Sequence, residues 1–142
     1  MKLRTLIYDI ETGRLERSLS ALTAMGALVS GAEIWIAHDR ASFGNSMMWL
    51  PVIISPVAAA AGVGGFFSKR MAKTVLPVTS AVVIANGLQG LYFHARGVSQ
   101  RPGGWREFRY NLEMGPPVFA PLLVTLVGGI GLFAAALRRE DD

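Results

Sequence analysis

The sequence predicts an all-α integral membrane protein, folded as an antiparallel bundle of four transmembrane helices with an interfacial segment in its third loop. Of its 142 residues 51% are hydrophobic and 17% are charged, whereas soluble domains carry about 25% charged residues. The stretch 74–93, TVLPVTSAVVIANGLQGLYF, has no charge at all. A bilayer core about 30 Å thick is crossed by about 20 apolar residues in a helix, so this stretch is long enough to span.

Three further apolar runs repeat this pattern, and the charged residues gather between the runs. The predicted spans cover 19–37, 47–67, 74–93 and 116–137, and together they form one domain over 1–142. Short connections between consecutive spans predict antiparallel neighbours. The chain has no Cys, which excludes disulfides and Cys-ligated metals.

The orientation follows from the distribution of Lys and Arg. Nine of these residues fall on one side of the predicted bundle, in the N-terminal tail, the second loop and the C-terminal tail. The other five fall in the first and third loops. Because cytoplasmic loops carry the excess of positive charge, we expect a multi-pass protein of the cell membrane with both termini in the cytoplasm.

Glu33 is the ionisable side chain that lies well inside a predicted span. It follows Gly26 and Ser30 at helical spacing, so the three residues are expected to share a face that points into the bundle. Charged groups inside spans usually face the bundle interior and pair there. We therefore expect Glu33 to reach a polar partner, with Arg40, Asn86, Gln89 and Arg96 as the candidates.

Asn86 and Gln89 are the amides inside a span, and their spacing puts them on one face. If the first and third spans both run outward, these amides lie at the depth of Glu33. The resulting cluster is either structural, because amides bond between helices in lipid, or a small polar pocket. The pocket candidates are Glu33, His38, Asn86, Gln89, His94 and Arg96.

The two histidines, His38 and His94, both follow predicted outward-going spans. Two histidines on different helices of a four-helix bundle are a pattern that can hold a b-type haem. Each is also an ordinary residue for a membrane interface. No metal site is predicted, and no cofactor other than this haem alternative is expected.

The third loop contains WREFRYNLEM, in which aromatic and charged residues alternate closely. Aromatic rings prefer the headgroup level, and Arg can bind lipid phosphate there. We expect residues 105–112 to form an interfacial or docking element. The docking candidates are Trp105, Arg106, Phe108, Arg109 and Tyr110.

The sequence contains no Walker loop, GxGxxG, HExxH or GxSxG motif, so an enzyme is not the favoured class. No nucleic-acid signature is present, and the expected partners are the bilayer and either another membrane protein or further copies of the chain. The composition is that of a small bacterial-type membrane protein, an accessory or anchor subunit or a self-associating bundle. The alternatives are a small-solute or proton-coupled carrier using Glu33, Asn86 and Gln89, and a haem-bearing electron-transfer subunit.

Recovery of the protein should require detergent, and a C-terminal alkaline phosphatase fusion should be inactive. The reason is the basic asymmetry, which keeps the C-terminus in the cytoplasm, where the phosphatase does not acquire its disulfides. Phosphatase activity in cells carrying the fusion is the measurement. An active fusion would overturn the predicted topology.

Overall fold

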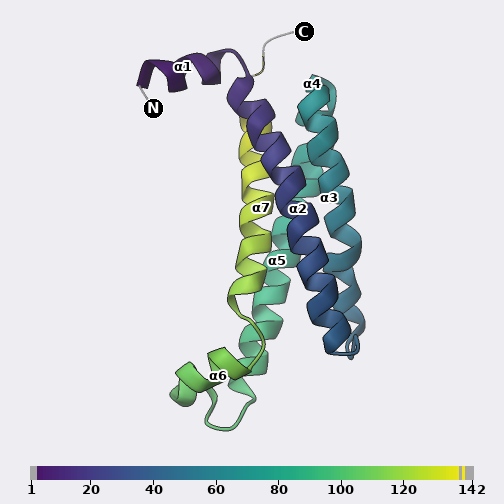
Figure 1. The fold of residues 1–142 in the computed structure, drawn as a ribbon, viewed down its shortest axis with the longest axis vertical. Coiled ribbons are helices and arrows are strands. Elements are labelled where there is room, and N and C mark those ends of the chain that lie inside the picture. The colour runs from purple at the N-terminus through teal and green to yellow at the C-terminus, as the bar shows by residue number, and fades with distance from the viewer. Residues whose placement is uncertain (1–2, 138, 140–142) are drawn as a thin grey trace.

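The computed structural model describes residues 3–137 and 139, and the regular structure within these ranges is entirely helical (Figure 1). This confirms the all-helical prediction. The elements are α1 (Leu3–Glu11), α2 (Arg14–Arg40), η1 (Ser46–Met48), α3 (Trp49–Phe67), α4 (Lys69–Lys73), α5 (Val75–Ser99), η2 (Gly104–Glu107), α6 (Phe108–Met114) and α7 (Phe119–Ala136).

Four of these helices are long and apolar enough to cross a membrane, as predicted: α2, η1 with α3, α5 and α7. Helices α2 and α5 extend past the predicted spans at one or both ends, because nothing in the polar flanking residues interrupts the helix. Helix α7 begins later than predicted, at Phe119. Pro116 precedes Pro117, and the residue before a proline is disfavoured from the helical backbone conformation.

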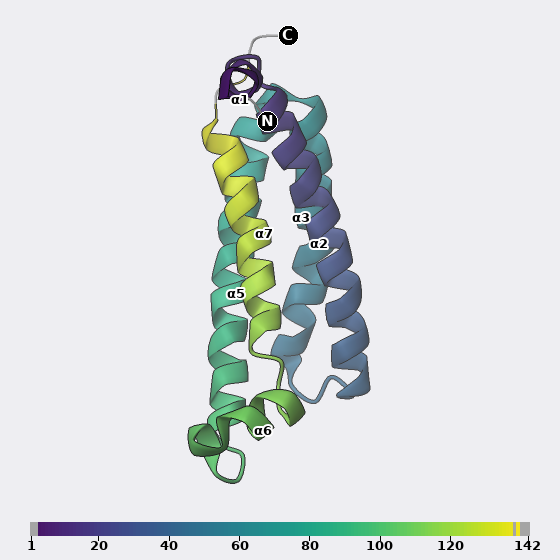
Figure 2. The same cartoon turned by 60° about the vertical axis from the view of Figure 1, so that its left-hand side comes forward.

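The four long helices lie side by side, and neighbours in the chain run in opposite directions (Figures 1 and 2). Gly62 of α3 lies beside Ser20 and Ala24, near the start of α2, whereas Gly31, farther along α2, lies beside Ser55. The same reversal relates α5 and α7. The start of α2 and the end of α7 therefore lie at one end of the bundle, and α6 lies at the other.

Small residues fill the interior and large apolar residues cover the outside. The buried hydrophobic residues of the long helices are mainly alanines, such as Ala24, Ala27 and Ala58. Val29 near the middle of α2 and Leu126 near the middle of α7 are 70% and 62% exposed. In water this arrangement would leave large apolar patches wet. In lipid it is the expected arrangement, because small residues let helix backbones approach closely.

At the end of the bundle where α2 begins, α1 lies crosswise to the long helices and projects away from them to one side (Figure 1). The turn between α1 and α2 is made at Gly13, whose φ of 67° is left-handed and suits glycine. Leu3 and Ile7 on α1 are exposed. Their spacing gives α1 an apolar face of the kind that lies on a membrane surface.

Replacing Gly62 by Ala should destabilise the bundle. A Cβ at Gly62 would lie 2.7 Å from the backbone N of Ala24 and from the backbone O of Ser20, so two helices would have to separate. Overpacking of this kind costs about 1–3 kcal/mol. Gly129→Ala is the matched control, because a Cβ there meets nothing within 4 Å.

The measurement is unfolding in detergent micelles by circular dichroism. Gly129→Ala should be neutral or slightly stabilising, because Ala is the better helix former by about 1 kcal/mol. Equal stability of the two variants would contradict the close contact between α2 and α3.

Candidate functional site

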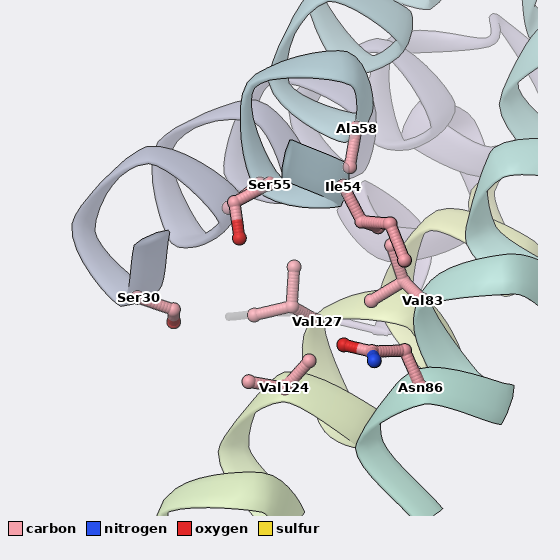
Figure 3. Close-up of a pocket in the computed structure, with 9 residues that line it drawn as sticks. Ser30, Ile54, Ser55, Ala58, Val83, Asn86, Val124 and Val127 are labelled. Atoms are coloured by element: carbon pink, nitrogen blue, oxygen red, sulfur yellow. The ribbon is translucent and has the colours of Figure 1, made fainter. Parts of the chain in front are cut away.

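A small cavity lies between the four long helices, and residues of all four line it (Figure 3). The space open to the centre of a water molecule is about 10 Å³. Three polar residues face it, Ser30, Ser55 and Asn86. The apolar part of the lining is Ala27, Ile54, Ala58, Val83, Val124 and Val127.

Asn86 and Ser30 are the polar residues of this cavity whose side chains lack a hydrogen bond within the described part of the chain. The Asn86 side chain is buried and points into the cavity (Figure 3). By contrast, the Ser55 hydroxyl donates to Pro51 O at 2.7 Å. A space of about 10–15 Å³ holds one water. The cavity is therefore just large enough for a single water hydrogen-bonded to the Asn86 amide.

The predicted cluster of Glu33, Asn86 and Gln89 is not formed in this chain. Asn86 faces the interior, but Glu33 and Gln89 are exposed on the outside of α2 and α5. Glu33 has no hydrogen bond or ion pair within residues 3–137 and 139. The prediction that Glu33 points into the bundle and pairs there is therefore wrong for the isolated chain. Arg40 and Arg96 are also exposed.

The physical reason lies in which residues form the inner face of α2. The residues of that face follow one another at alternating spacings of four and three. They are Glu16, Ser20, Thr23, Ala27, Ser30 and Ile34. Each residue turns the helix by about 100°. Glu33 therefore lies roughly 100° away from Ile34. Gly26 is on the same flank, where it contacts Val127 of α7.

His38 and His94 lie at the far ends of α2 and α5, and each ring is fixed by a backbone carbonyl. Nδ1 of His38 is 2.8 Å from Met48 O, and Nδ1 of His94 is 2.8 Å from Pro117 O. In the neutral ring Nδ1–H donates, which leaves Nε2 as an acceptor. The first bond ties the end of α2 to η1, and the second ties α5 to the segment that precedes α7. Among the described residues, no group of three or more His, Asp or Glu side chains is placed to hold a metal.

A buried ion pair lies at the other end of the bundle. Glu16 of α2 and Arg139 are 1% and 3% exposed. Arg139 Nε lies 3.5 Å from Glu16 Oε2. The two terminal nitrogens of Arg139 donate to Gly65 O at 2.5 Å and to Phe66 O at 2.9 Å. One guanidinium therefore joins the start of α2 to the end of α3.

Lys73 makes a similar link to α7. Its Nζ donates to Ala135 O at 2.8 Å and also to Leu137 O. The last carbonyls of a helix have no partner within the helix and carry a partial negative charge, which cations stabilise. Arg139 and Lys73 thus cap α3 and α7. We call Glu16, Lys73 and Arg139 the end clamp.

The opposite end carries a structured platform, which consists of η2 and α6. Asn111 is fully buried at its centre. Its amide nitrogen donates to Pro102 O at 3.0 Å and to Gly104 O at 2.8 Å, and Arg101 Nε donates to its Oδ1 at 3.2 Å. Gly103, with a φ of 77°, makes the turn that these bonds close.

The predicted docking residues cover the outside of this platform. Trp105, Phe108 and Tyr110 are 48%, 59% and 59% exposed. Arg106 and Arg109 are exposed between them. The ion pair of Arg109 with Glu113, at 3.4 Å, is solvent-accessible and contributes little to stability. The geometry therefore presents three rings and two cations on a fixed backbone.

Sequence reasoning missed the residues that hold both ends, Glu16, Asn111 and Arg139. A signal for Glu16 was present, because Glu16, Ser20 and Thr23 continue the inner face of α2 at steps of four and three. Asn111 and Arg139 had no comparable signal, since their partners are backbone carbonyls.

Comparison with known proteins adds no assignment to this geometry: no protein-family model, no curated protein and no solved structure matches the chain.

Replacing Arg139 by Leu should destabilise the protein by about 3–5 kcal/mol, the usual cost of removing one partner from a buried ion pair. The variant leaves the Glu16 carboxylate unpaired and uncaps Gly65 O and Phe66 O. Unfolding in detergent is the measurement. The double variant Glu16→Leu with Arg139→Leu should recover part of the loss, because no buried charge remains. A single variant as stable as the parent protein would exclude the end clamp.

Proposed function

We propose that the chain is a four-span integral membrane protein that acts as an accessory or anchor subunit of a membrane complex. The four long helices form an antiparallel bundle across the bilayer, with the end clamp on the cytoplasmic side and the platform outside. The burial of alanines and the exposure of large apolar residues support insertion into a bilayer. The basic residues near the clamp support this orientation.

The observation that carries the docking function is the construction of the platform. Three half-exposed rings stand on a backbone that the buried Asn111 fixes through three hydrogen bonds. A mere linker of this length would need no such anchor. Exposed aromatic and Arg side chains on a rigid support are the residues that dominate binding energy at interfaces. They also suit the headgroup layer, where the partner would be met.

The carrier alternative has less support. The central cavity has room for about one water, and two of the three polar residues expected to bind a solute lie outside it. The haem alternative has the free Nε2 atoms of His38 and His94 in its favour, but each ring already holds a helix end in place. A visible absorption spectrum of the purified protein tests that alternative directly.

Replacing both Trp105 and Phe108 by Ser should reduce recovery of the partner complex from membranes, without changing the stability of the bundle. Both rings are about half exposed, so their loss costs little folding energy. The readout is cross-linking in native membranes followed by purification of the tagged chain and mass spectrometry.

Glu113→Gln is the control, because it removes the exposed ion pair with Arg109 and keeps the rings. It should recover the complex as the parent protein does. If the double Ser variant also recovers the complex unchanged, the platform is not the docking surface.

A further inference from the structure

The outer face of α2 combines a ridge of large apolar side chains with a carboxyl group. Leu22, Met25 and Val29 are 49%, 64% and 70% exposed, and Glu33 follows on the same flank at a spacing of four. In a bilayer this face looks toward lipid. A carboxyl group there is costly unless a donor reaches it, and no described residue of the chain does so.

The opposite side of the bundle carries a groove between α3 and α5 of about 160 Å³. A cavity of about 150 Å³ holds a benzene molecule, so the groove has room for aliphatic side chains. Its lining is Ile53, Ile54, Val57, Val78, Thr79 and Val82. The Thr79 hydroxyl already donates to Val75 O and Leu76 O, at 2.9 and 3.0 Å. The groove therefore needs an apolar occupant.

The Gln89 amide lies past the end of the groove, farther along α5. Gln89 is exposed on α5 and lies two helical turns after Val82, on the same face. Like Glu33, it makes no hydrogen bond within the described residues. The face formed by α3 and α5 thus repeats the composition of the α2 face, with an apolar part followed by a polar group, but it presents a donor where α2 presents an acceptor.

Glu33 and Gln89 also lie at the same depth. Ala27 of α2 and Val83 of α5 belong to one layer of the core, and both helices run in the same direction (Figure 1). Glu33 lies six residues after Ala27 in α2, and Gln89 lies six residues after Val83 in α5. Since each residue advances a helix by about 1.5 Å, the two groups remain level.

We propose that the α2 ridge of one copy of this chain packs into the α3–α5 groove of a second copy, where the Gln89 amide donates to the Glu33 carboxyl group. Copies inserted with one topology are related by rotation about the membrane normal, so groups can meet only at equal depth. The two faces differ, and the contact is therefore heterologous and closes into a ring when the rotation permits. This inference rests on the bilayer insertion proposed above.

The absence of Cys makes the contact directly testable by cross-linking in native membranes. Two full-length variants, Met25→Cys and Val82→Cys, whose positions lie at nearly equal depth, are co-expressed with different tags and oxidised. Leu126→Cys is the matched control: it is 62% exposed on α7, and its neighbour Val127 contacts Gly26 at the depth of the ridge.

A disulfide between the Met25→Cys and Val82→Cys chains is the expected result, with little cross-linking of Leu126→Cys to either. Adding Glu33→Leu should weaken association about three- to tenfold, the range for one hydrogen bond between helices in lipid. Glu33→Gln should restore most of it, because an amide oxygen also accepts from Gln89.

Three results would overturn the proposal. Dominant pairing of Met25→Cys with itself would indicate a symmetric α2 contact. Equal cross-linking of Leu126→Cys would indicate random collision. No cross-link at all would leave the groove to an acyl chain or another membrane protein. Protection of Met25→Cys from a water-soluble maleimide in the same membranes shows insertion, which distinguishes failure of this contact from failure of the proposed membrane function.

Discussion

The close approach of helix backbones is the constraint on which the rest of the structure depends. Helices gain no hydrophobic free energy by leaving lipid for one another, so contact must come from packing and hydrogen bonds. Gly62 against α2, and Gly87 and Gly128 between α5 and α7, each lie where a Cβ would come within 3 Å of a neighbouring backbone atom. Hence the interior is built of Gly, Ala and Ser, and the larger side chains face outward.

This packing leaves hydroxyl groups inside, and most of them bond to their own helix. Ser20 donates to Glu16 O at 2.9 Å and Thr23 to Leu19 O at 2.8 Å. These bonds satisfy each hydroxyl donor within its own helix, so the small side chains need no polar partner on the neighbouring helix. The directional bonds between elements are concentrated at the two ends, in the end clamp and around Asn111. Close packing of small side chains therefore holds the middle of the bundle together, whereas ion pairs and hydrogen bonds hold its two ends.

The four long helices could be predicted from the sequence because length and the absence of charge are local properties. The aromatic and Arg content of residues 105–112, which is also a local property, led to the expectation of an interfacial or docking element there, and that role stays a prediction. The direction of Glu33 could not be predicted from its spacing with Gly26 and Ser30. That spacing shows that the three residues share one side of the helix, but it does not show which side faces the core. Which flank faces inward is decided by Ala27 and Ile34, which pack in the core. Arg139 was unpredictable because it acts over more than seventy residues of chain.

The central claim is that the bundle crosses a bilayer with the end clamp and the platform on opposite sides. Labelling of single cysteines with a membrane-impermeant maleimide in intact cells tests it most directly. Tyr8→Cys on α1 and Tyr110→Cys on α6 are both exposed positions, and Val29→Cys lies between them in depth. The account predicts labelling of Tyr110→Cys in intact cells, of Tyr8→Cys only after lysis, and of Val29→Cys only after denaturation. Labelling of Tyr8→Cys and Tyr110→Cys from the same side, or ready labelling of Val29→Cys, would contradict it.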